Sequence, residues 1–211
     1  MKKTKRLLLV LPIVALLVAV LWAPATTSAA PKTKYEQLSA TGLVSYIDEG
    51  NVKQLPNGRW LVKDRNVTGA FTGGDFAGLG FALTYNGLIE SALTQVGVFQ
   101  GEMSIGSQYQ ARIWGATGIT EMHPVTPAEL PAALVPFLCA DITGDGQADV
   151  CSPLPRLSFG GAWNFTGTTH GFGQFSGWFV FVPDLDAQGN PHVGTILPNL
   201  SDITVTGLWR Q

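Results

Sequence analysis

The sequence predicts an all-β protein, a single antiparallel barrel or sandwich of about 8–10 strands with one long helical or loop excursion. Short runs of alternating apolar and polar residues recur along the chain, and turn-forming Gly, Asn and Asp residues separate them. Aromatic residues make up 10% of the chain and lie inside these runs, together with many of the 25 glycines. Charged residues make up only 13%, against about 25% in an average globular protein. This composition is typical of an exported β protein.

The first 29 residues have the order of a secretory signal peptide. A basic start over residues 2–6 precedes an apolar run over 7–22, and small residues follow. Thr27 and Ala29 fit the small-residue positions before a cleavage site, so we expect residues 1–29 to be removed. A retained N-terminal anchor is the alternative, although the apolar run is shorter than the roughly 20 residues of a membrane-spanning helix.

The charge of the mature chain limits its partners. Removal of residues 1–29 leaves nine basic and fifteen acidic residues, a formal charge of −6. An acidic chain argues against binding to nucleic acid and, after signal cleavage, to anionic membrane surfaces. We therefore expect a secreted, periplasmic or extracellular protein whose partner is a small-molecule ligand or another extracellular protein. The oligomeric state stays open.

The mature chain begins with polar residues 30–40, which we expect to form a flexible N-terminus, and a single β domain follows over 41–211. The stretch 54–74 predicts a hairpin, because Asn57-Gly58 is a strong two-residue turn signal between alternating flanks. Further strands, punctuated by glycine, are expected at 76–87 and 94–106.

A clean alternation marks the next strand, over 108–119. Tyr109, Ala111 and Ile113 fall on one face, and Arg112 falls on the opposite, polar face. Trp114 breaks the pattern because it also falls on the polar face. A tryptophan on an exposed β face binds sugars or apolar ligands, whereas one inside a barrel belongs to the core. The other tryptophans of the mature chain lie in apolar runs, which predict core positions.

The middle of the chain changes character over 121–156, which carries six prolines. Thr126 and Glu129 have the spacing of a capping box, with Pro127 at the first helical position. The following prolines limit this helix to a turn or two. We expect an acidic, disulfide-closed insertion between two β halves.

Glycine alternates with aromatic and polar residues in the second half, where strands are expected at 157–167, 169–184, 192–197 and 202–211. The texture of "THGFGQFSG" resembles secreted calycin-like and allene-oxide-cyclase-like β-barrels. That resemblance implies a barrel and carries over no catalytic residue.

The two cysteines, Cys139 and Cys151, are expected to form a disulfide in an oxidising compartment. Between them lies the acidic loop, residues 139–151. Its alternate positions match the oxygen ligands of an EF-hand loop, with glycine at the sharp turn. The candidate ligands are Asp141, Thr143, Asp145, Gln147 and Asp149.

The stretch "DITGDGQAD", residues 141–149, resembles the calcium loops of dockerins and EF-hand proteins. The resemblance implies a structural Ca²⁺ ion. Ser152 replaces the last acidic ligand and "SPLP" excludes an exit helix, so the loop is not expected to act as a sensor. A solvated, disulfide-tied turn is the alternative.

Two functional hypotheses follow. The first is an exported non-enzymatic protein with a calcium loop, which binds a small ligand or acts as an extracellular interaction module. The second is a secreted barrel enzyme of the cyclase or isomerase type, acting on a small apolar substrate. His170 is a candidate ligand-binding residue if its strand lines a barrel, and Trp178 is another. The enzyme requires His170 and Glu102 to point into one cavity.

Overall fold

The computed structural model describes residues 34–91, 94–185 and 191–210, without the side chains of residues 120, 185 and 191–193. The expected signal peptide, residues 1–29, lies outside the described residues. None of the helices in the described ranges is long and apolar enough to cross a membrane.

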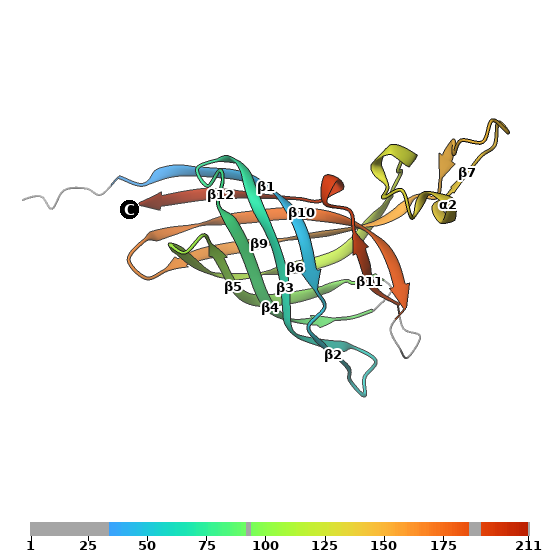
Figure 1. Cartoon of the computed structure of the whole chain (residues 1–211). Coiled ribbons are helices and arrows are strands. Elements are labelled where there is room, and N and C mark those ends of the chain that lie inside the picture. Colours follow the sequence, from blue (N-terminus) through green and yellow to red (C-terminus); the bar gives the residue numbers. More distant parts are fainter. Residues whose placement is uncertain (1–33, 92–93, 186–190, 211) are drawn as a thin grey trace, which may run out of the picture. The chain divides into compact units, whose positions relative to one another are not determined.

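The structure confirms the predicted all-β class and selects a barrel. Eight strands are joined in the order β1-β12-β10-β9-β6-β5-β4-β3, and β3 pairs back with β1, so the antiparallel sheet closes (Figure 1). The barrel strands are β1 Glu36–Asp48, β3 Trp60–Gly74, β4 Gly80–Ile89, β5 Gly97–Ile105, β6 Tyr109–His123, β9 Leu154–Thr166, β10 His170–Leu185 and β12 Asp202–Arg210.

Two further strands extend the barrel wall. Strand β2, Asn51–Gln54, pairs with the start of β3, and β11, Pro191–Ile196, pairs with the end of β10. The β2–β3 hairpin confirms the turn signal at Asn57-Gly58, and Gly58 takes a positive φ of 82°. Its loop is longer than two residues, because the Leu55 N–H donates to the Arg59 carbonyl across residues 55–59.

Alternation along the strands separates a dry interior from a polar outer wall. In β6, Ala111 and Ile113 are buried in the core, while Arg112 and Trp114 face outward. The interior is filled by apolar side chains from all eight strands, which pack into one cluster. Among its fully buried large members are Phe71, Leu83, Met103, Ile113, Leu157, Trp163, Phe179 and Ile203.

Inward-facing glycines make room for the aromatic rings of this core. A Cβ atom on Gly207 would lie 2.6 Å from Cζ2 of Trp163, and one on Gly177 would lie 2.6 Å from Cζ of Phe159. The alternation of glycine and aromatic residues in the sequence therefore reflects the packing of aromatic rings against glycines in the interior. The same pairing recurs between directly opposite residues: Gly115 with Phe99, Gly161 with Phe175, and Gly173 with Trp163.

An aromatic cluster closes one end of the barrel. Phe76, in the β3–β4 turn, is buried, and its ring centroid lies 5.5 Å from that of Phe71 and 5.3 Å from that of Tyr109. The rings of Trp209 and Phe165 lie 5.7 Å and 6.4 Å from it. Side chains rather than solvent therefore occupy this end of the lumen.

The structure places two boundaries differently from the sequence prediction. Strand β1 begins at Glu36, so residues 36–40 belong to the barrel and not to a flexible N-terminus. Leu38 and Ala40 alternate inward between polar residues, and the closing β1–β12 pairing orders them.

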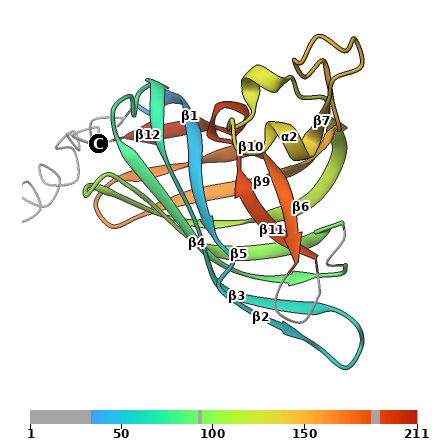
Figure 2. The same ribbon diagram turned by 45° about the vertical axis from the view of Figure 1, so that its right-hand side comes forward.

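The excursion spans 124–153 rather than 121–156, because β6 and β9 continue to pair as far as His123 and Leu154. It holds a single 3-10 turn, Pro127–Glu129, and a four-residue helix α2, Val135–Leu138, so the long helical excursion is absent from the described chain. Figure 2 shows α2 and β7 beyond the end of the barrel strands.

A small second core attaches the excursion to the barrel. Val125, Leu130 and Leu154 pack with Val180 of β10 and with Leu197, and all five are buried. Val180 lies on the outer side of its strand, since its neighbours Phe179 and Phe181 belong to the main core. The excursion thus covers the outer wall at this end.

Candidate functional site

Among the residues that the structure describes, Arg65 is the buried charge of the barrel interior, and it is paired. Arg65 is only 4% exposed, and its guanidinium donates to the Glu49 carboxylate, to the Glu49 carbonyl oxygen at 3.3 Å and to Gln95 Oε1 at 3.4 Å. Burial raises the pKa of the neighbouring Tyr85 hydroxyl, and the Arg65 charge opposes this shift. Because the guanidinium is paired with a carboxylate and hydrogen-bonded, the burial of Arg65 is accounted for by its structural role.

The outer wall instead carries polar side chains in rows that cross the strands. Strand register places Asn86, Gln100 and Trp114 side by side on β4, β5 and β6. The same row continues over β9, β10 and β12 with Ala162, Gln174 and Thr206. We call these six residues the central row.

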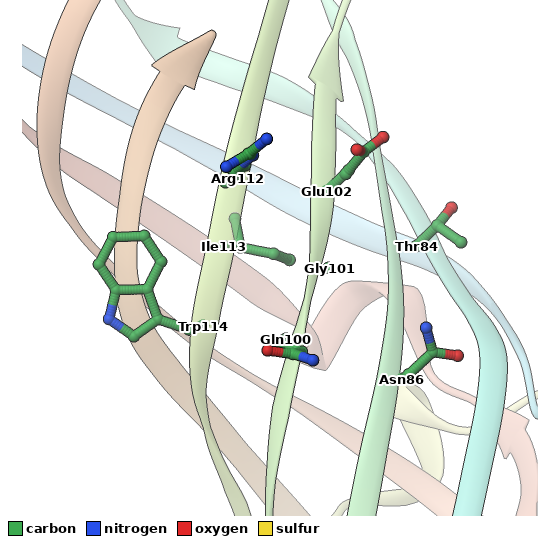
Figure 3. Close-up of a pocket in the computed structure, with 8 residues that line it drawn as sticks. All are labelled: Thr84, Asn86, Gln100, Gly101, Glu102, Arg112, Ile113 and Trp114. Carbon is green, nitrogen blue, oxygen red and sulfur yellow. The ribbon is translucent and has the colours of Figure 1, made fainter.

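The first hollow lies on the outer side of β4, β5 and β6. Figure 3 shows its side chains in two rows, Thr84–Glu102–Arg112 and Asn86–Gln100–Trp114. Glu102 lies directly opposite Arg112 in the sheet, so the two charges of the hollow balance. The Oδ1 atom of Asn86 accepts the Asp64 N–H at 3.0 Å, which fixes its amide and leaves the NH₂ group as a donor.

The second hollow lies on β6, β9, β10 and β12, and Trp114 lines it as well. Its floor is made of small residues from the row beside the central row: Ala116, Gly160, Ser176 and Thr204. Gln174 and Thr206 stand at its far side. Because the two hollows share Trp114, they are adjacent to each other on the outer face of the barrel.

Trp114 is the aromatic centre of this surface. Its side chain is 50% exposed, and its indole extends from β6 to the side away from Gln100 (Figure 3). Alternation within β6 forces this orientation, as the sequence predicted, because Ile113 occupies the core. By contrast Trp163 is 1% exposed, and its Nε1 donates to the carbonyls of Gln174 and Thr206 at 3.1 Å each.

The structure does not bring the other candidates together. Glu102 is on the outer wall of β5, and His170 is the exposed first residue of β10, opposite Arg210. These two side chains therefore do not share a barrel cavity. Trp178 lies half-buried on the outer wall, with the Arg156 guanidinium 3.9 Å from its ring centroid.

The acidic loop is closed by the predicted Cys139–Cys151 disulfide, which joins the short strands β7, Cys139–Ala140, and β8, Val150–Cys151. A disulfide is compatible with an oxidising exterior. Inside the loop, the Asp141 carboxylate accepts the N–H groups of Gly144 at 2.6 Å and Gly146 at 2.8 Å. Asp149 Oδ2 accepts the N–H groups of Ile142 and Thr143 and the Thr143 hydroxyl, each at 3.0 Å.

These carboxylates serve as backbone acceptors in the loop. Asp145 does the same, because its Oδ1 accepts the Gln147 N–H at 2.8 Å. Within the described ranges no three His, Cys, Asp or Glu side chains converge as a metal-binding group. The five predicted ligands lie in one exposed loop, and calcium binding there stays a prediction that requires the loop to rearrange.

We expect the acidic loop to loosen in acid. The Gly146 and Gly144 N–H bonds lower the pKa of Asp141, and the Thr143 N–H and hydroxyl lower that of Asp149. A depressed carboxyl pKa stabilises the folded loop fully above the unfolded value of about 3.9, and this contribution is lost as the pH falls through the folded pKa. Amide NMR shifts of Gly144 and Gly146 should titrate below that value and stay constant from about pH 5 to 8. A titration midpoint at or above the unfolded pKa contradicts the prediction. So does a titration that is unchanged in Asp141→Asn, because the Asp141 carboxylate is expected to cause it.

Comparison of the chain with protein-family models, curated proteins and solved structures gives no match. The functional argument therefore depends on the geometry of the chain itself. That geometry adds Asn86, Gln100, Gln174 and Thr206 to the site. Only their alternate positions in polar strand faces signalled them in the sequence.

Proposed function

We propose that this protein is an exported, non-enzymatic binding module, and that its ligand lies on the outer wall of the barrel around Trp114. One observation carries the proposal: a half-exposed tryptophan is shared by two adjoining hollows lined with amide and hydroxyl groups. Tryptophan offers a large, rigid contact area at low entropic cost, which is why it dominates many binding surfaces.

The packed interior supports this placement over a catalytic lumen. A barrel enzyme needs polar groups that converge on an enclosed space. The inward-facing residues form one apolar cluster, and the buried Arg65 is engaged by Glu49 and Gln95. Export is supported by the order of residues 1–29 and by the disulfide.

Substitution of Trp114 is expected to weaken binding selectively. In a ligand-observed NMR screen of sugars, amino acids and short peptides, the hits should bind Trp114→Ala at least about tenfold more weakly, a loss of about 1.4 kcal/mol. Phe172→Ala is the matched control, because Phe172 is an exposed aromatic of β10 outside both hollows. Hits that bind Trp114→Ala as tightly as the wild type would overturn the proposal.

We also propose that the acidic loop binds a structural calcium ion, on the spacing of its oxygen-bearing residues. Extracellular calcium modules bind with dissociation constants of about 10⁻⁴ to 10⁻³ M. Calorimetry at millimolar calcium should then show a heat of binding that Asp145→Ala abolishes and that Asp75→Ala, outside the loop, retains. No calcium-dependent heat means that the loop is a hydrogen-bonded turn.

A further inference from the structure

We propose that the ligand of the outer wall is a neutral polysaccharide, lying across the strands along the central row. This inference rests on the proposed function, since it names the chemistry that the wall around Trp114 would recognise. It is argued from the extent of the surface, its hydrogen-bonding groups and its charge.

The extent of the surface favours a long ligand. Both hollows share Trp114, and the central row crosses six neighbouring strands. At about 4.8 Å between strands, the row from β4 to β12 measures about 24 Å along the curved wall of the barrel. A single small molecule covers one hollow, whereas an extended chain is able to occupy both.

The chemistry of the row matches hydroxyl-rich sugar rings. Gln100 and Gln174 present amides that both donate and accept hydrogen bonds, as does the Thr206 hydroxyl, and Asn86 presents its NH₂ group as a donor. A sugar ring has C–H faces that pack on an aromatic ring and a rim of hydroxyls that donate and accept. The indole of Trp114 extends to the side of β6 on which β9 lies, where the row carries only the small Ala162, and it is half exposed, so a sugar ring can pack on it (Figure 3).

The charge of the wall excludes other chain-like ligands. Glu102 and Arg112 are the charged residues that line the two hollows, and they lie opposite each other, so the surface favours a neutral polymer. Nucleic acid and acidic polysaccharides require a basic surface. A peptide that adds a strand requires an open sheet edge, and every strand under the central row is paired on both sides.

Calorimetry on the exported protein tests the proposal. Each hexasaccharide is compared with the corresponding disaccharide, and the four hexasaccharides are cellohexaose, xylohexaose, maltohexaose and chitohexaose. At least one hexasaccharide should bind, about tenfold or more tighter than its disaccharide. Gln174→Ala, in the second hollow, and Gln100→Ala, in the first, should each weaken hexasaccharide binding, while Phe172→Ala should not. The melting temperature of each variant checks that it is folded.

The outcomes separate this inference from the proposed function. If none of the four hexasaccharides binds, or if disaccharide and hexasaccharide bind equally, the polysaccharide assignment is wrong. If a peptide or amino acid then binds in a manner that requires Trp114, the proposed function, ligand binding on the outer wall, is still supported. Sugar binding that is unaffected by Trp114→Ala and Gln174→Ala overturns both.

Discussion

Trp163→Ala is expected to lower the free energy of unfolding by about 3–5 kcal/mol, the range for removal of a large aromatic side chain from a core. Trp163 is buried in the barrel, and its ring centroid lies 4.7 Å from that of Phe165. Its indole fills the space that the absent side chain of Gly207 leaves free, and it lies opposite Gly173 in the sheet. Those glycines cannot expand into the resulting cavity, and the two carbonyls that accept its N–H lose a donor.

Urea denaturation measures this loss, and Trp114→Ala provides the matched control. The control removes the same side chain from the outer wall, where it is half exposed, so we expect a smaller loss of about 1 kcal/mol. Equal losses for the two variants would show that the interior is not packed around Trp163. Such a result would reopen the lumen as a ligand site.

Gly161→Ala is the second substitution with a large expected effect. Its Cβ would lie 2.0 Å from the carbonyl oxygen of Trp114 and 2.6 Å from Cα of Gly115. Both atoms belong to the backbone of β6, so no rotation of a side chain relieves the overlap. Forcing one strand away from its neighbour should cost about 3 kcal/mol, the upper part of the usual range for overpacking.

Thermal unfolding of Gly161→Ala beside Gly80→Ala tests this prediction. Gly80 also lies in a barrel strand, but its added Cβ would meet its nearest atom, the Gly69 carbonyl oxygen, at an ordinary 3.6 Å. We expect a fall in melting temperature of several degrees for Gly161→Ala and little change for Gly80→Ala. Similar melting temperatures for both variants would contradict the close approach of β6 and β9.

Local patterns predicted those parts of the fold that depend on neighbouring residues. Alternation placed Tyr109, Ala111 and Ile113 on the inner face of β6 and Trp114 on the outer wall. Turn chemistry located the β2–β3 hairpin at Asn57-Gly58. The start of β1 was missed, because its order comes from pairing with β12 at the opposite end of the chain.

The candidate site was only partly predictable for the same reason. Trp114 was singled out in the sequence because it broke a pattern. The partners of Trp114 depend on register. Pairing of β6 with β9 across the excursion places Ala162 beside Trp114, and pairing of β9 with β10 places Gln174 one strand further along the row. No local signal encodes that juxtaposition. The spacing of Asp141, Asp145 and Asp149 predicted a calcium loop, but spacing does not reveal that backbone N–H groups already engage their carboxylates.

The most direct test of the central claim, that the ligand binds outside the barrel, is a chemical-shift map of the exported protein with a bound oligosaccharide or other hit. The largest changes are expected at the indole N–H of Trp114 and the side-chain amides of Gln100 and Gln174. The backbone amides of the interior residues Val44 and Phe71, on strands that the central row does not cross, should stay unchanged. Largest changes at Val44, Phe71 and the buried Arg65 would instead place the ligand in the lumen and contradict the account.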